Sequence, residues 1–173
     1  AEAVQVVLDG QATRISGVIR RTLRSFTLDA AQATITDSVD IINRGATSVQ
    51  LAFGRVEGAL LRLSNSADGH ITALIGEVDA AIARFTNWGT GSLRVGVESL
   101  RTGLLDVRNA GEGALELWAD TVEARETRIS NLGPGALITR IERLRTDLLD
   151  IRSAGQGALL FWANEVRARR VDI

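Results

Sequence analysis

The sequence predicts an all-β protein: a right-handed parallel β-helix, or β-solenoid, of about eight coils of 22 residues each. Two observations lead to this prediction, a 22-residue repeat and the alternation of apolar residues within each repeat. The chain has 173 residues, of which 45% are hydrophobic, and this is enough to build one domain with a sizeable core.

The repeat is clearest in two segments that start 44 residues apart and match at more than half of their positions. They read ESLRTGLLDVRNAGEGALELWADTVEARETRI, from Glu98, and ERLRTDLLDIRSAGQGALLFWANEVRARRVDI, from Glu142. A related segment, SNLGPGALITRIERL, lies midway between them, so the period is 22. The sequence therefore predicts six regular coils without gaps, at residues 42–63, 64–85, 86–107, 108–129, 130–151 and 152–173.

Within each coil, apolar residues at positions 8, 10, 12, 15, 20 and 22 are expected to face the interior of about three short strands. Position 2 holds asparagine in five successive coils, and we expect the stacked amides to form a hydrogen-bonded ladder at one corner. The asparagines are Asn43, Asn65, Asn87, Asn109 and Asn131. Glycines at positions 4 and 6 are expected to supply backbone conformations that residues with a Cβ atom avoid. Parallel crossovers favour right-handed winding.

Residues 1–41 are less regular, and the sequence favours two imperfect coils there as part of the same domain. Val4, Val6 and Leu8 alternate in the same way as residues 26, 28 and 30. The alternative is a capping helix over residues 12–26 followed by one coil, because apolar side chains there also fall on one helical face.

The coils VRNAGEGALELWADTVEA and IRSAGQGALLFWANEVRA resemble the right-handed parallel β-helix superfamily, whose best-known members are pectate lyases. The resemblance covers nearly the whole chain and implies the fold. The superfamily includes polysaccharide lyases and hydrolases, phage tailspikes and adhesin passenger domains. Its enzymes gather acidic residues and an arginine or lysine in a groove bordered by long loops, which these uniform coils do not carry. The sequence therefore predicts a non-enzymatic protein without a cofactor.

Composition excludes several other classes. With 20 basic and 21 acidic residues, the chain lacks the basic excess of a nucleic-acid-binding protein. It has no cysteine and one histidine, so thiol catalysis, iron–sulfur clusters, disulfides and typical zinc sites are excluded. That histidine, His70, occupies a variable turn position, where no Ser-His-Asp arrangement is expected. No apolar run approaches the roughly 20 residues of a membrane span.

An acidic column is expected at position 13, where Glu98, Asp120 and Glu142 follow one another in successive coils. Stacking would place these carboxylates about 5 Å apart, close to the separation in retaining glycosidases, and their oxygens would also suit calcium. Nearby arginines are expected to neutralise the column as a solvated surface instead, so no metal site is predicted. They are Arg101, Arg143 and Arg145.

Two apolar stripes are expected on the outside. Trp118 and Trp162 share position 11, two coils apart, and Ile138 and Leu160 lie on the same face at position 9. Position 19 forms the other stripe, with Leu60, Ile82, Leu104 and Leu148. Exposed stripes indicate contact with a partner, either another copy of this chain or a polysaccharide stacked on the tryptophans. The alternative is that these positions lie at a corner and face inward.

Both ends of the chain bear on the expected function. The start at Ala1, without methionine, suggests a secreted or surface protein after processing, or the edge of an expressed fragment. The last coil ends at Ile173 without a cap, so its open rung is expected to pair with another subunit unless the chain has been trimmed. The leading hypothesis is therefore a structural solenoid that assembles end to end or side by side into an extracellular filament or oligomer. The second is a carbohydrate-binding, adhesin or phage-fibre module, and the third a polysaccharide lyase or hydrolase that uses the acidic column.

Overall fold

A computed structural model describes residues 3–20 and 23–173, and within these ranges it shows nine β-strands and no helix. The strands are β1 (Ala3–Val7), β2 (Gly10–Ile19), β3 (Ser25–Asn43), β4 (Ser48–Asn65), β5 (His70–Asn87), β6 (Leu93–Asn109), β7 (Leu115–Asn131), β8 (Leu137–Ser153) and β9 (Leu159–Asp172). They form one parallel sheet in the order β1-β3-β4-β5-β6-β7-β8-β9, and β2 also pairs with β3.

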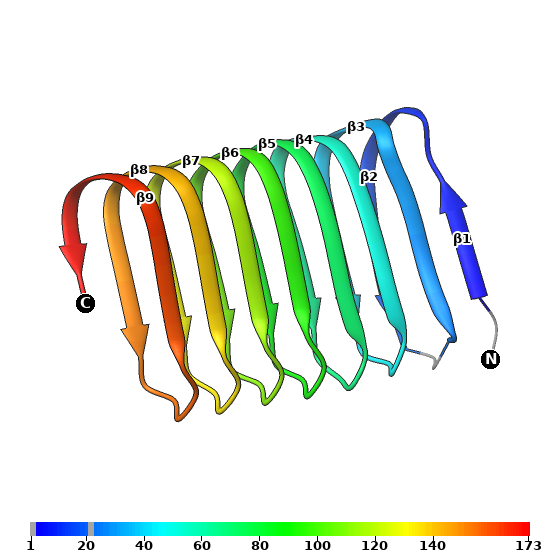
Figure 1. Cartoon of the computed structure of the whole chain (residues 1–173). Helices are drawn as coiled ribbons and strands as arrows, with labels where there is room; N and C mark the ends of the chain where they lie inside the picture. The colour runs from blue at the N-terminus through cyan, green and yellow to red at the C-terminus, as the bar shows by residue number, and fades with distance from the viewer. Residues whose placement is uncertain (1–2, 21–22) are drawn as a thin grey trace.

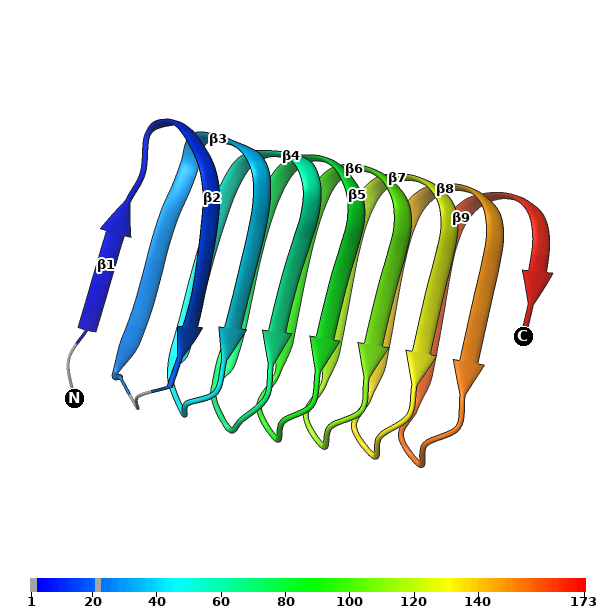
Figure 2. The same cartoon turned by 180° about the vertical axis from the view of Figure 1, so that it is seen from behind.

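The sheet is wound into a solenoid of about eight coils (Figures 1 and 2). β1 and β2 together make the first coil, and each later strand makes one coil by itself. The chain rises along one face, passes over a rounded edge and descends along the other face while it advances from the N-terminus to the C-terminus. This is right-handed winding, the hand expected for parallel crossovers. The structure thus confirms the predicted parallel β-helix.

The register between coils is the 22-residue repeat. From β4 onward, each paired residue lies 22 positions from its partner; for example, Ser48 pairs with His70, and Asn65 with Asn87. The pairing skips positions 13 and 18, such as Gly54 and Ala59, where the strand bends. The three short strands expected in each coil are therefore one long strand with two bends.

The N-terminal coils depart from this regular register. Val4 pairs with Phe26 and Val6 with Leu28, which is the alternation visible in the sequence. β3 then shifts register twice against β4, within residues 30–38. Because Gly10–Ile19 is a strand, the alternative capping helix is wrong over the described part of residues 12–26; residues 21 and 22 lie outside the described ranges.

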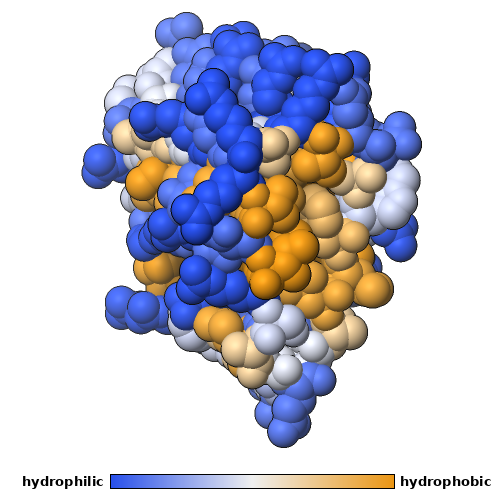
Figure 3. Space-filling view, turned by 90° about the vertical axis from the view of Figure 1, so that its left-hand side faces the viewer, coloured by the Kyte–Doolittle hydropathy of each residue, from blue (hydrophilic) through white to orange (hydrophobic). Residues whose placement is uncertain are grey.

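Columns of aliphatic side chains fill the interior. At position 22, Leu63, Phe85, Val107 and Ile129 stack in successive coils and are all fully buried. Figure 3 looks onto the C-terminal end, where apolar side chains gather in the middle and hydrophilic residues surround them. β9 is the outermost coil there, so its interior-facing Val166 and Val171 are exposed.

The glycine columns have a different cause from the one the sequence suggested. Among the described residues only Gly10 and Gly58 have a positive φ, so unusual backbone angles do not explain positions 4 and 6. The turns of successive coils instead lie very close together. A Cβ atom on Gly91 would come within 1.8 Å of the carbonyl oxygen of Gly69, and one on Gly113 within 1.9 Å of that of Gly91. These positions need glycine because the preceding coil occupies the space.

The asparagine column lies beside these turns and is fully buried. The Nδ2 atoms of Asn43, Asn65 and Asn87 each donate to the Oδ1 atom of the next asparagine, at 3.2, 3.1 and 3.3 Å. Asn109 and Asn131 instead donate to backbone carbonyls of the turns, at 3.0 to 3.1 Å. The amide ladder therefore links four coils, from Asn43 to Asn109. The last two asparagines of the column, Asn109 and Asn131, donate to backbone carbonyls instead.

We expect Asn65→Ala to lower the free energy of unfolding by about 2 kcal/mol, because Asn65 donates to Ala67 and Asn87 and accepts from Asn43 inside the protein. Removing the amide leaves buried partners without hydrogen bonds. Urea denaturation followed by circular dichroism measures the change. The control is Asn164→Ala, at an exposed position, which should change stability by less than about 0.5 kcal/mol. Equal effects of the two substitutions would contradict a structural role for the ladder.

Candidate functional site

A groove of about 730 Å³ lies on the face formed by the first segments of β7, β8 and β9. Its lining includes Trp118, Arg140 and Trp162, which occupy position 11 in three successive coils and pair in register. Strand alternation points these side chains outward, since the neighbours of Trp118 in the strand, Leu117 and Ala119, are buried in the core. The groove is therefore built on the outer surface of a rigid sheet.

The two tryptophans give this groove its apolar surface. Trp118 is 38% exposed and Trp162 is 49% exposed. They are separated by two coil spacings, which is about 10 Å along the solenoid axis. Leu160 is exposed beside them and Ile138 is half-buried, and both line the groove at position 9. Two indole rings on one column form a platform for flat, partly apolar ligands.

Charged groups lie against this platform. Asp120 and Glu142 line the groove at the first bend of their strands, and Arg140 lies between the two tryptophans in the column. In the part of the chain that the structure describes, none of these three side chains forms an ion pair. The groove thus offers two carboxylate acceptors and one guanidinium donor to a ligand.

A second groove, of about 630 Å³, continues along the same face toward the N-terminus. Trp118 and Asp120 line both grooves, so we treat the two as one feature and call it the axial groove. Leu74 and Glu98 also line the second part, and small residues leave it open. The small residues are Ala31, Ala52, Gly54, Gly76 and Gly96. The axial groove therefore runs along the solenoid rather than around it.

The acidic column of the sequence is one edge of the axial groove. Glu98, Asp120 and Glu142 are exposed, lie in consecutive coils and line the groove from β6 to β8. The expected neutralisation is wrong for two of the arginines, because Arg101 pairs with Glu123 at 3.5 Å and Arg143 donates to Thr121. The described residues contain no group of three or more histidine or acidic side chains arranged to hold a metal ion.

The second apolar stripe lies elsewhere. Position 19 belongs to the descending segment of each coil, so its residues do not join the tryptophans. Leu60, Ile82, Leu104 and Leu148 are half-buried, and Glu126 interrupts the column between the last two. This stripe offers less apolar surface than the sequence suggested, because residues in register shield one another.

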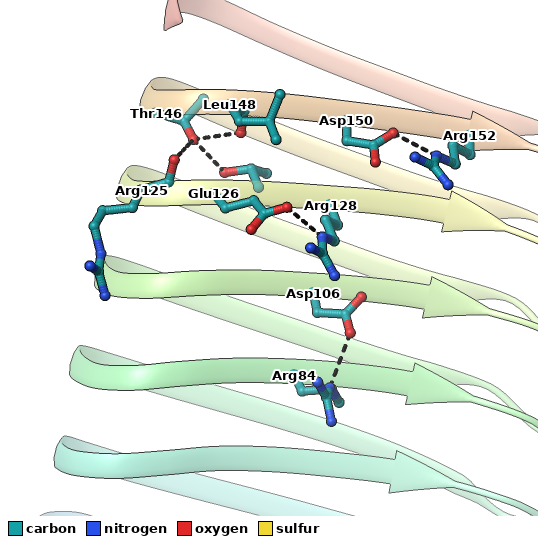
Figure 4. Close-up of polar contacts among 10 residues, drawn as sticks. Arg84, Asp106, Arg125, Glu126, Arg128, Thr146, Leu148, Asp150 and Arg152 are labelled. Atoms are coloured by element: carbon teal, nitrogen blue, oxygen red, sulfur yellow. Dashed lines mark hydrogen bonds and ion pairs between the residues drawn. The ribbon is translucent and has the colours of Figure 1, made fainter. Parts of the chain in front are cut away.

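Ion pairs cover the surface around this stripe (Figure 4). Arg84 pairs with Asp106 at 3.0 Å, Arg152 pairs with Asp150 at 2.9 Å, and Arg128 pairs with Glu126. The hydrogen bond to Glu126, assisted by its charge, raises the pKa of Arg128 above its usual value. The guanidinium is charged at neutral pH with or without this shift, so the raised pKa means only that the ion pair with Glu126 favours the charged form. The carboxylates Asp106, Glu126 and Asp150 on this face are therefore compensated within the chain, unlike those of the axial groove.

His70 is the first residue of β5, directly after a turn, and lies outside the axial groove. Its Nδ1 atom is 3.0 Å from the Ser92 Oγ atom and accepts a hydrogen bond from the Ser92 backbone N–H, also at 3.0 Å. The nearby Asp68 carboxylate accepts a hydrogen bond from Thr90. The histidine thus links two successive turns.

Comparisons with protein-family models, with curated proteins and with solved structures gave no match. The described residues include no helix long and apolar enough to cross a membrane. Fold and groove define the chain as a parallel β-helix with an aromatic groove along its axis. Membership of the pectate-lyase-like superfamily remains what the resemblance implies, whereas the β-helix fold itself is established.

Sequence reasoning proposed the tryptophans as contact residues but did not include the other residues of their outward column in the candidate site. Arg140 and Leu74 share their column, and their exposure follows from the same alternation that places Trp118 outside. The open part of the groove was also missed, because a glycine such as Gly96 at an outward position gives no chemical signal by itself. A comparison of side-chain size along position 11 could have found this hollow.

Proposed function

We propose that this protein is a non-enzymatic β-solenoid module that binds a linear polysaccharide along the axial groove. The observation that carries this proposal is the pair of exposed tryptophans, Trp118 and Trp162, on one outward column of the same groove. Sugar rings have apolar faces that pack flat on indole rings, and their hydroxyls bond to carboxylates and guanidinium groups. The axial groove supplies all three kinds of group.

The spacing favours an extended polymer over a single sugar. In an extended chain of β-1,4-linked pyranoses, each ring advances the chain by about the spacing between neighbouring coils of a parallel β-helix. That spacing is about 4.8 Å. A chain that lies along the axis would therefore stack every second ring on a tryptophan and place the ring between them over Arg140. The open stretch beyond Trp118 gives room for further sugars.

We expect Trp118→Ala and Trp162→Ala each to weaken binding of a β-1,4-linked sugar hexamer about tenfold, because each removes one stacking platform. Isothermal titration calorimetry measures the affinity. Trp88→Ala is the matched control, because Trp88 is exposed at a turn, packs near Arg108 and does not line the axial groove. The proposal would be contradicted if the hexamer bound equally well without the two groove tryptophans, or if Trp88→Ala weakened binding as much as they do.

The non-enzymatic part of the proposal has its own readout. Incubation of the sugar hexamer with the protein should leave the length of the hexamer unchanged, as measured by mass spectrometry of the sugars. Shortened products that disappear in Asp120→Asn would favour the lyase or hydrolase hypothesis instead. Because polysaccharides of this kind lie outside cells, the proposal places the protein in a secreted or surface location.

A second candidate function is self-association into an oligomer or filament, side by side through this face or end to end, as the sequence suggests. The observation that favours it is Leu74, which is 64% exposed on the same face as the tryptophans. Light scattering and electron microscopy over a concentration series test it. Assemblies that dissociate in Leu74→Arg, in the absence of sugar, would support this candidate over the first.

A further inference from the structure

We infer that the polysaccharide bound in the axial groove carries ammonium groups, as a polymer of β-1,4-linked amino sugars does, rather than carboxylates or sulfates. This inference rests on the proposed function and specifies its ligand. It is carried by the charge of the groove, since Glu98, Asp120 and Glu142 line one edge and Arg140 is the single basic residue in the lining.

The carboxylates are available to a ligand. All three are exposed, and in the described residues none is engaged in an ion pair or hydrogen bond within the chain. Most other surface carboxylates near an arginine are paired, as Glu77 is with Arg55 at 2.9 Å and Asp106 with Arg84 at 3.0 Å. Three carboxylates without an ion pair therefore lie in consecutive coils at the groove, where a cationic ligand would compensate them.

The arrangement also matches a repeating ligand. The carboxylates occur once per coil over three consecutive coils, at the spacing of one sugar per coil. Successive rings of an extended β-1,4-linked chain point their amino groups to opposite edges, so every second sugar presents an ammonium group to the acidic edge. The opposite edge, at position 9, presents the aliphatic side chains of Ile138 and Leu160 beside the tryptophans. Ammonium groups are therefore favoured on the acidic edge alone.

Arg140 does not reverse this preference. It lies between Trp118 and Trp162 in the tryptophan column, where it would face ring and hydroxyl oxygens of the sugar placed above it. A polymer of uronic acids would gain one favourable contact there and would meet three carboxylates along the acidic edge. Like charges at short range oppose binding, so such a polymer is disfavoured.

The test compares β-1,4-linked glucosamine, glucose and glucuronate hexamers by calorimetry at mildly acidic pH, which keeps the amines protonated. We expect the glucosamine hexamer to bind most tightly, with an affinity that falls as salt is added. The double variant Asp120→Asn/Glu142→Gln should weaken its binding about fivefold, the effect expected of two exposed ion pairs. The same variant should weaken binding of the glucose hexamer by a smaller factor, because the amides of Asn and Gln still hydrogen-bond to sugar hydroxyls and stacking on the tryptophans is retained.

The matched control is Asp79→Asn/Glu112→Gln, which makes the same change of charge at exposed positions outside the axial groove. It should leave all affinities unchanged. If the glucose hexamer binds in a tryptophan-dependent way but the glucosamine hexamer binds no more tightly, the inference is wrong and the proposed function stands. An equal or higher affinity for the glucuronate hexamer also overturns the inference. If no hexamer binds, the proposed function fails with it.

Discussion

Gly91→Ala is expected to lower the free energy of unfolding by about 3 kcal/mol or more. The new Cβ atom would lie 1.8 Å from the carbonyl oxygen of Gly69, and the obstacle is backbone rather than the end of a flexible side chain. Two turns of the solenoid would have to move apart, which strains the register of the coils on both sides. Urea denaturation followed by far-ultraviolet circular dichroism measures the loss.

Gly96→Ala is the matched control for this substitution. A Cβ atom there would meet only the end of the exposed Leu74 side chain, at 3.1 Å, and the backbone of Ala73 at 4.0 Å. Leu74 can rotate away, so stability should change by less than about 0.5 kcal/mol. If both alanine variants were equally stable, close contact between the turns would not be the reason for the glycine column.

Phe85→Ala is expected to cost about 3 to 5 kcal/mol, because Phe85 is fully buried and its removal leaves a cavity in the centre of the solenoid. Its neighbours in the column, Leu63 and Val107, are held in register by the sheet and can move little to fill the space. The measurement is the free energy of unfolding in urea, supported by the thermal midpoint.

Leu74→Ala provides the comparison, since Leu74 is an apolar residue of the same coil that points outward. It should change stability by less than about 0.5 kcal/mol. Phe85→Leu keeps most of the volume and should recover much of the loss seen in Phe85→Ala. A small effect of Phe85→Ala would mean that the interior column does not limit stability.

Much of the architecture is predictable because the repeat makes identical positions stack. Once the period of 22 is known, the outward direction of Trp118 follows from the burial of its neighbours, and the contact of Asn43 with Asn65 follows from the stacking. The N-terminal coil is less predictable. There the strand propensity of residues 10–19 competes with an apolar spacing that also suits a helix, and pairing with β3 decides the outcome.

The candidate site shows the opposite balance. The sequence places Trp118, Trp162 and the acidic column on an outer surface, but it gave the wrong partners to the carboxylates. Arg101 is near Glu98 in sequence, yet its side chain pairs with Glu123 of the next coil. Such choices depend on side-chain directions across neighbouring coils, which spacing along the chain does not determine.

The sequence by itself determined the period, the parallel stacking, the interior columns and the six regular coils, because each depends on a pattern that recurs every 22 residues. Only the tertiary structure decided which outward residues share a groove and which charges stay unpaired. These properties arise from the local absence of side chains at Gly54, Gly76 and Gly96 and from contacts between coils. A repeat specifies what is common to all coils, whereas a binding site is made by the differences between them.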